Sequence, residues 1–297
     1  MKPYEQRTVD TQYHDLLQHI MTNGRDVMPI HGESTKMIMG HQMRFDMRNG
    51  FPLITERDMS GQFLRAALGE HIAFLNGART HAELSEFGCK YWLRWTAKDH
   101  AAKFGLEEGD LGKGSYGPGW TAVPTSEGAP FNQIEHVVRQ IIERPYLRTH
   151  IIDPWIPQYV IQHDDLQRST VVAPCHGWIH VLCFPQSKEL AVHHFQRSAD
   201  SPVGLPFNMV QYAAFGMMIA HLTGYKFVEY VHTLSDAHIY SSQFDHVAEL
   251  LAREPRKLPT MTLQADGIEK VTDFRPEHFI LGDDYDPHPK MMIPTPV

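Results

Sequence analysis

The chain has 297 residues, of which 42% are hydrophobic and 21% are charged, and its net charge is −8 with the histidines neutral. These values are typical of globular proteins, and the acidic balance argues against a surface that coats nucleic acid. Three widely spaced cysteines argue against a disulfide framework, and no apolar run approaches the ~18 residues of a membrane span. We therefore expect a cytoplasmic protein without a metal, a membrane anchor or a stable nucleic-acid partner.

The first third of the chain predicts two helices and a hairpin. Apolar residues recur at helical spacing over 12–22 and again over 61–76, which predicts an amphipathic helix at each place. Between them, apolar and polar residues alternate over 36–47, and the turn dipeptide Asn49–Gly50 follows. We expect residues 51–55 to form the returning strand of that hairpin.

The middle of the chain predicts a long loop, a helix and a short strand. Residues 105–130 are rich in Gly and Pro and predict a loop, and loops of this length are usually functional or disordered. The apolar spacing over 132–143 predicts a further helix, which Pro145 ends. Residues 150–156 are expected to form a short strand.

Two strong strand candidates follow, at 170–184 and at 189–199. The short segment 185–188 joins them and predicts an antiparallel hairpin. Pairing across this loop places Cys183 near Leu190, and this pair sets the register of the whole hairpin.

The same register brings Cys175 close to Arg197 and Ser198. A cysteine in a strand is usually a small core residue. A guanidinium beside a thiol, however, stabilises the thiolate and lowers the thiol pKa from about 8.5, and the arginine and serine together resemble a grip for an anion. From the residues alone, Cys175 is therefore either a core residue or a nucleophile.

The last third of the chain predicts a buried helix, a strand and a second helix. Residues 207–224 are apolar on nearly every side, as in a helix in the interior of a sizeable protein. Residues 227–240 predict a strand that runs into a loop, and 241–254 predict a helix. Long helices mix with hairpin strands without regular βαβ alternation, so we expect one α+β domain over 1–297, with a mixed sheet packed against long helices.

Two further groups of polar residues are candidates for binding. Either Asp200 or Asn208 is expected to cap the buried helix, and the amide of Asn208 could instead read the edge of a base because it both donates and accepts. Asp236, His238 and Tyr240 alternate along the chain and therefore share one face of the strand. That face is either a hydroxyl-binding site or a capped turn.

The order and spacing of these motifs resemble the thymidylate synthase superfamily, which also includes nucleotide hydroxymethylases. The resemblance covers most of the chain and depends on an ordered series of motifs rather than on any one of them. The motifs are Ala-Pro-Cys-His at 173–176, Phe-Gln-Arg-Ser-Ala-Asp at 195–200, Gly-Leu-Pro-Phe-Asn at 204–208 and Asp-Ala-His-Ile-Tyr at 236–240, supported by 40–55, 69–77, 109–117, 253–259 and 284–289.

The resemblance implies covalent catalysis on dUMP. Cys175 would be the nucleophile that adds to C6, which makes C5 carbanion-like and able to accept a one-carbon unit from methylenetetrahydrofolate. Glu70 would organise water and move protons at O4 of the base. The other residues implied in catalysis are polar groups around the base and the folate, namely Tyr116, His176, Asp200 and Asn208, of which Asn208 would read N3 and O4 of uracil.

The resemblance also implies two sets of binding residues and no metal ligand. The residues implied in nucleotide binding hold the phosphate, the base or the sugar hydroxyl: Arg197, Ser198, Gln196, Asn208, His238, Tyr240 and Arg148. The residues implied in folate binding or in closing the site over the folate are Trp92, Trp95, Asp200, Arg57 and the terminal Val297.

The chain departs from the family where the nucleotide phosphate binds. No arginine occupies the family's loop before the first strand, because Arg25 is out of register, and the family's arginine pair is reduced to Arg148–Thr149. Up to two phosphate-facing arginines are therefore missing. Either histidines such as His31 or His150 replace them, or the nucleotide is held differently.

The resemblance leaves the product open. The main expectation is reductive methylation of dUMP to dTMP, which the tryptophan pair and the full-length tail favour. The alternative is hydroxymethylation to 5-hydroxymethyl-dUMP, which the unusual phosphate loops favour, and a remote alternative is a non-catalytic nucleotide-binding relative. Because the family forms homodimers with shared sites, the resemblance also implies a homodimer in which residues 146–150 face the partner's site.

Overall fold

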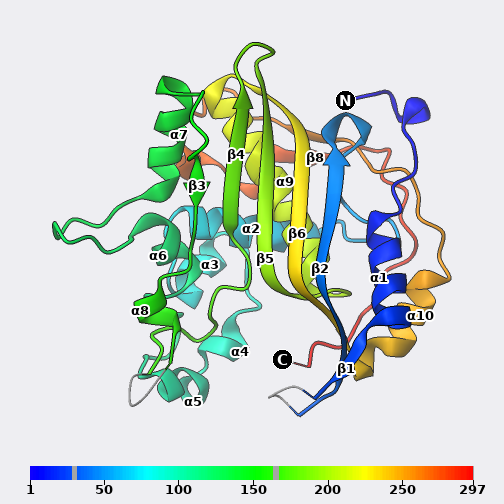
Figure 1. The fold of residues 1–297 in the computed structure, drawn as a ribbon, viewed down its shortest axis with the longest axis horizontal. Coiled ribbons are helices and arrows are strands. Elements are labelled where there is room, and N and C mark those ends of the chain that lie inside the picture. The colour runs from blue at the N-terminus through cyan, green and yellow to red at the C-terminus, as the bar shows by residue number, and fades with distance from the viewer. Residues whose placement is uncertain (29–31, 163–166, 297) are drawn as a thin grey trace.

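A mixed sheet of six strands, in the order β1-β2-β6-β5-β4-β3, forms the centre of the fold (Figure 1). The computed structural model describes residues 1–28, 32–162 and 167–296. Neighbouring strands are antiparallel except for β5 and β6, which run parallel. The strands are β1 (Arg25–Val27), β2 (Thr35–Asp46), β3 (Ile151–Ile152), β4 (Trp178–Phe184), β5 (Glu189–Asp200) and β6 (Lys226–Tyr240), and a separate two-stranded sheet pairs β7 (Met261–Leu263) with β8 (Phe279–Leu281).

The long helix α9 (Gly204–Thr223) connects the parallel pair β5 and β6 and lies in the core. It is apolar on all sides because the sheet covers one side of it and α2 (Gln62–Leu75) packs on another. Both helices lie behind the sheet in Figure 1, and in the described part of the chain no helix covers the face turned toward the viewer. The expected α+β class, mixed sheet and buried central helix are confirmed.

The helices expected from apolar spacing are confirmed with end shifts of up to three residues. The expected helices over 12–22 and 132–143 are α1 (Gln12–Asn23) and α7 (Gln133–Glu143). The helix expected over 241–254 is α10, which is shorter than expected and spans Phe244–Leu251. The remaining α-helices of the described residues are α3 (His81–Glu86), α4 (Leu93–Thr96), α5 (Lys98–Ala101), α6 (Tyr116–Thr121) and α8 (Pro157–Val160).

The hairpin expected between 36–47 and 51–55 is wrong. Strand β2 pairs with β1 on one side and with β6 on the other, and residues 51–55 form no strand. A short 3-10 turn, Met47–Asn49, follows β2, and the chain then carries Phe51 into the core, where its side chain is fully buried. The turn dipeptide correctly marked a change of direction, but burial of the apolar residues after it outweighed strand pairing.

Three further boundaries differ from the sequence prediction. The expected loop 105–130 contains α6, because a proline is tolerated in the first turn of a helix, where Pro118 lies. The strand expected from residue 170 begins only at Trp178, since Pro174 cannot donate to a ladder and Gly177 has a φ of 104°. Strand β6 does not run into a loop, because β2 pairs with it as far as Tyr240.

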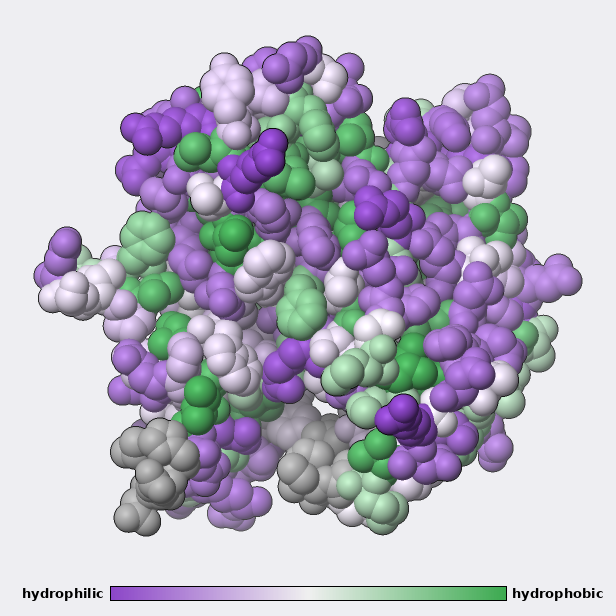
Figure 2. Space-filling view, viewed as in Figure 1, coloured by the Kyte–Doolittle hydropathy of each residue, from purple (hydrophilic) through white to green (hydrophobic). Residues whose placement is uncertain are grey.

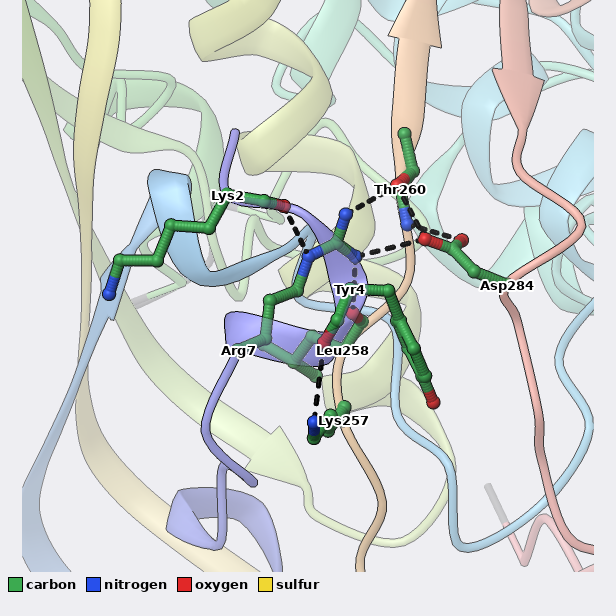
Figure 3. Close-up of polar contacts among 7 residues, drawn as sticks. All are labelled: Lys2, Tyr4, Arg7, Lys257, Leu258, Thr260 and Asp284. Carbon is green, nitrogen blue, oxygen red and sulfur yellow. Dashed lines mark hydrogen bonds and ion pairs between the residues drawn. The ribbon is translucent and has the colours of Figure 1, made fainter.

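The N-terminal segment is tied to the start of the C-terminal tail by a buried arginine (Figure 3). Arg7 is 5% exposed, and its Nη1 donates to the carbonyl of Leu258 at 2.8 Å and to Asp284 Oδ2 at 3.1 Å. Its Nη2 donates to Thr260 Oγ1 at 2.6 Å, and Nε donates to the carbonyl of Lys2 at 3.0 Å. These contacts fix the point from which the tail continues toward residue 296.

Candidate active site

Cys175 lies in the loop before β4 and is held against the end of β5. Its carbonyl accepts from the backbone N–H of Arg197 at 2.8 Å and of Ser198 at 3.4 Å, and its own N–H donates to the hydroxyl of Tyr116 at 2.8 Å. The expected register of the β4–β5 hairpin and the expected closeness of Cys175 to Arg197 are therefore confirmed, although Cys175 lies outside the strand.

The guanidinium of Arg197 contacts the thiol directly. Its Nη2 lies 3.3 Å from Cys175 Sγ, and its Nε and Nη2 donate to the carbonyls of Pro174 and Ala173 at 2.8 Å each. Burial raises the pKa of the Cys175 thiol, and the positive charge of Arg197 opposes that rise. Burial outweighs the guanidinium, so the pKa of the thiol lies above its ordinary value and the expectation of a lowered thiol pKa is wrong.

A cavity of about 300 Å³ opens beside the thiol. Its polar part is formed by Asp153, Cys175, His176 and Arg197, and its aromatic walls include Trp155 and Trp178. The guanidinium of Arg197 lies over the ring of Trp155, 5.6 Å from its centroid. This volume is at the small end of ligand pockets, and the combination of aromatic walls and few polar groups is typical of them.

His176 is part of a buried stack of rings. Its ring lies parallel to that of Tyr116, with 4.4 Å between centroids, and its Nδ1 is 2.5 Å from the hydroxyl of Tyr212. The ring of Tyr212 in turn stacks on the ring of His194, with 3.6 Å between the two ring centroids. Burial lowers the pKa of His176 well below its usual value, so its imidazole is neutral at physiological pH.

Glu70, on α2, is buried with both carboxylate oxygens occupied. Oε1 accepts from the indole N–H of Trp92 at 2.5 Å, and Oε2 accepts from the amide of Gln211 at 2.5 Å. The side chain is 5% exposed, and burial raises its pKa. A carboxyl with a raised pKa can hold and release a proton near neutral pH.

Neither Asp200 nor Asn208 caps α9, whose N-cap is Val203, so the expectation that one of them does is wrong. The helix begins at Gly204, and the side chain of Asn208 is buried between Gln196 and Gln211, with hydrogen bonds of 2.9 Å to each. Asp200 comes closest to a cap, since its Oδ1 accepts from the N–H of Val203 at 3.3 Å. The amide of Asn208 is thus available for a specific polar role inside the core.

Asp200 connects the site to the C-terminal tail through Gln243. The amide of Gln243 lies 3.2 Å from each oxygen of Asp200 and donates to the carbonyl of Pro294 at 2.9 Å. Arg57 holds the same tail, because its Nη1 donates to the carbonyl of Met291 at 3.3 Å. Burial raises the pKa of Asp200 to about 6.

A polar face at the ends of β5 and β6 joins the remaining expected residues. Ser198 Oγ donates to Asp236 Oδ2 at 2.7 Å, and His238 Nδ1 lies 3.0 Å from Asp236 Oδ1. The ring of Tyr240 meets that of His238 edge to face at 5.1 Å, and Asp200 is paired with His238 in the sheet register. The expectation that these side chains share one face is confirmed.

Other residues expected in the site lie away from Cys175 or outside the residues that the structure describes. Arg148 is exposed, and its carbonyl accepts from His180 Nε2 at 3.1 Å. His150 is fully buried, which makes it unsuitable as a substitute for a phosphate-binding arginine. Trp95 is half-buried under the guanidinium of Arg94, 4.6 Å from its ring. Val297 and His31 lie outside the described residues.

Sequence reasoning missed Gln211, Gln243 and His232, which complete the polar contacts of the site. Gln211 lies three residues after Asn208 on α9, and such a pair shares one face of a helix. That spacing could have indicated Gln211. No local signal connects Gln243 with Asp200 or His232 with Gln196, because their contacts cross from one element to another.

In the described part of the chain, no three His, Cys, Asp or Glu side chains are grouped to hold a metal ion, and no helix is long and apolar enough to cross a membrane.

The family model described as thymidylate synthase matches residues 11–297, essentially the whole chain. This family carries out folate-dependent transfer to C5 of dUMP, with methylenetetrahydrofolate as cosubstrate. With Cys175 beside Arg197 in this fold and a match of this length, the chain belongs to the thymidylate synthase family of transferases.

Proposed function

We propose that the protein converts dUMP to dTMP by reductive methylation. The observation that carries this proposal is the closed tail: Gln243 binds both Asp200 and the carbonyl of Pro294, while Met291 and Ile293 are each 8% exposed. A docked tail excludes water from the site. Exclusion of water favours hydride over water as the group that completes the new carbon substituent.

Cys175 is the nucleophile in this proposal. Its thiolate adds to C6 of the pyrimidine, and the electrons of the C5–C6 double bond move toward O4. Arg197 supports the thiolate by its contact with Sγ, and a bound nucleotide phosphate would compete for the same guanidinium. Because burial raises the pKa of this thiol, the positive charge of Arg197 is the contribution that favours the thiolate.

Glu70 and Asn208 serve the base. The buried carboxyl of Glu70 moves protons at O4, and its raised pKa suits that task. Asn208 reads N3 and O4. Tyr116 holds the backbone of Cys175, and the neutral imidazole of His176 presents no competing charge to the base.

The sugar and phosphate are held by the polar face of β5 and β6. His238 and Tyr240 bind the 3′-hydroxyl, and Arg197 and Ser198 bind the phosphate. Ser198 already donates to Asp236, and Arg197 already donates to two carbonyls, so the phosphate receives few contacts from one chain. This shortage supports a contribution from Arg148 of a partner subunit.

The residues beside Asp200 fit a folate. Within the part of the chain that the structure describes, its buried carboxyl accepts from the amide of Gln243 and one backbone N–H, which leaves oxygen lone pairs for N–H donors of a ligand. Trp92 and Trp95 supply flat apolar surface, and Arg57 and the tail close the site. When bound, the folate supplies the one-carbon unit and, in methylation, the hydride.

A homodimer is supported by the open face of the central sheet. That face carries a mixture of hydrophobic and polar residues (Figure 2), and Trp178, His193 and Phe195 on it are partly exposed. Exposed aromatic residues on a sheet face without helices are typical of a surface covered by another chain. The edge strand β3 and the exposed Arg148 adjoin it.

The test is to incubate the protein with dUMP and methylenetetrahydrofolate and to weigh the nucleotide product. A gain of one methyl group with consumption of the hydride supports methylation. A gain of one hydroxymethyl group would instead make the protein a hydroxymethylase, and an unchanged nucleotide under conditions where both ligands bind would favour a non-catalytic relative.

A further inference from the structure

A chain of buried hydrogen bonds runs from Glu70 on α2 across α9 to β6. Gln211 Nε2 donates to Glu70 Oε2 at 2.5 Å, and Gln211 Oε1 accepts from Asn208 Nδ2 at 2.9 Å. Asn208 Oδ1 accepts from Gln196 Nε2 at 2.9 Å, and Gln196 Oε1 lies 2.9 Å from His232 Nε2. All five side chains are buried, so water is not available to replace a lost partner.

Two backbone carbonyls determine which way the amides in this chain point. The carbonyl of Ala67 accepts from Gln211 Nε2 at 3.1 Å, and the carbonyl of Ser198 accepts from Gln196 Nε2 at 3.0 Å. A carbonyl can only accept, so each glutamine must turn its NH₂ group toward that carbonyl. Gln211 therefore offers an oxygen to Asn208, whereas Gln196 offers an N–H.

Asn208 consequently has one permitted orientation. Its Nδ2 points at the oxygen of Gln211, and its Oδ1 points at the N–H of Gln196. Turning the amide over would set oxygen against oxygen on one side and N–H against N–H on the other, and both mismatches would be buried. One N–H and one oxygen lone pair of Asn208 remain for a ligand.

These two free groups match uracil and not cytosine. Uracil offers O4 as an acceptor and N3–H as a donor, which suit the remaining N–H and the lone pair of Asn208. Cytosine offers an amino group and an unprotonated N3, the reverse pattern, which requires the amide to turn over.

We infer that Gln211 is a positioning residue that sets the base preference of the site by locking the amide of Asn208. The inference depends on the base-reading role proposed above for Asn208. It assigns the effect to the polarity of the Gln211 side chain rather than to its volume, and this distinction can be tested.

The first test compares wild-type protein with Gln211→Met, which keeps the length of the side chain but removes its acceptor. Binding of dUMP and of dCMP is measured by calorimetry, and kcat/KM is measured for both. We expect the preference for dUMP over dCMP to fall by about tenfold or more, the equivalent of about 1.4 kcal/mol. A preference that survives unchanged in a folded Gln211→Met protein overturns the inference.

The second variant, Gln211→Glu, covers the case in which Gln211→Met does not fold. It keeps an oxygen acceptor for Asn208 Nδ2, and its second oxygen, which faces Glu70 and the carbonyl of Ala67, must hold a proton there. We expect the base preference to stay within about threefold of wild type. The limb of the pH profile that belongs to Glu70 should move to higher pH, since a neighbouring negative charge raises a carboxyl pKa. Loss of the preference, or an unmoved pH profile, would contradict the inference.

Met218→Leu is the matched control, because Met218 is fully buried on the same helix and is not part of the hydrogen-bond chain. It should change neither the base preference nor the pH profile. Wild-type protein that binds dUMP and dCMP equally would overturn the base-reading role of Asn208 together with this inference. A wild-type preference that persists in Gln211→Met overturns the inference alone.

Discussion

Cys175 carries a thiol whose pKa is raised by burial and held back by Arg197. Cys175→Ser replaces it with a hydroxyl that is far less acidic, so no nucleophile forms at neutral pH. We expect turnover to fall by at least about a thousandfold while the fold is retained. Turnover with dUMP and the folate, and the mass of the protein after incubation with both, measure the loss of activity and of the covalent adduct.

Cys183→Ser is the control for this substitution. Cys183 is a partly buried thiol on β4, and burial raises its pKa to about 11. It should retain wild-type activity within about threefold. More than a few per cent of activity in Cys175→Ser would mean that another group begins the reaction.

At the residue scale, the sequence predicted the contacts that depend on pairing between the neighbouring strands β4 and β5. The short β4–β5 loop fixed a register, and that register alone brought Cys175 to Arg197. The partners of Glu70 were not predictable in this way, because Gln211 is 141 positions away in the chain and reaches it only after α2 and α9 have packed.

The C-terminal tail is the element whose contacts decide how well water is excluded. Gln243→Leu removes the amide that joins Pro294 to Asp200, so the tail is less firmly docked. We expect methyl formation to slow by about tenfold or more and some hydroxymethyl product to appear, with dUMP binding retained. Product masses and a dUMP titration measure both effects.

Ser242→Ala is the matched neighbour for that experiment, because Ser242 is exposed and precedes Gln243 in the same turn. It should leave the product and its rate unchanged. If Gln243→Leu makes only the wild-type product at the wild-type rate, the tail is not what protects the reaction from water.

At the element scale, periodicity predicted the amphipathic helices well because each buries a stripe of its own apolar residues, and the buried helix α9 was recognisable because it is apolar on all sides. The failed hairpin at 51–55 shows the limit of local signals. Its apolar residues fit a returning strand, but β2 found its partner in β6, almost 200 residues later, and Phe51 entered the core instead. Competition between strand pairing and core burial is a property of the whole fold.

Among the described residues, burial lowers the pKa values of several histidines, and it does so most strongly for His71, His176, His194 and His232. For His71 and His232 the pKa falls to about 3. The unfolded chain binds these protons below about pH 6.5, whereas the native protein does not, so stability is lost as the pH falls through the range from 6.5 toward 3. Each histidine contributes a slope of up to about 1.4 kcal/mol per pH unit.

Urea unfolding at several pH values between 5 and 8 measures this dependence. Glu70 and Asp200 act in the opposite sense, because their pKa values are raised in the folded protein. Their contribution to the free energy of unfolding is lost as the pH rises. His71→Leu separates the contributions, because neither ring nitrogen of His71 has a hydrogen-bond partner among the described residues. This variant should be more stable in acid and show a shallower slope; an unchanged slope would mean that His71 is protonated in the native state.

A site shared between two subunits, as proposed above, would also be a property of the whole molecule. If Arg148 reaches the partner's phosphate site, Arg148→Ala should raise KM for dUMP with little change in kcat. Mixing Arg148→Ala with Cys175→Ser at low dUMP should then restore activity, because one site of each mixed dimer has both wild-type residues. Failure of rescue, when the subunits are shown to exchange, would place the action of Arg148 within its own chain.

The hydrogen-bond chain through Gln211 has a consequence for how this enzyme could evolve. Asn208→Asp is the simplest change toward cytosine, but it places a carboxylate oxygen against the oxygen of Gln211. Either the new carboxyl must hold a proton, or the amide of Gln211 must rotate and lose its hydrogen bond to Glu70. If Asn208 reads the base as proposed, a lineage that changes its base passes through an unfit intermediate unless both positions change together, and epistasis then protects the preference for uracil.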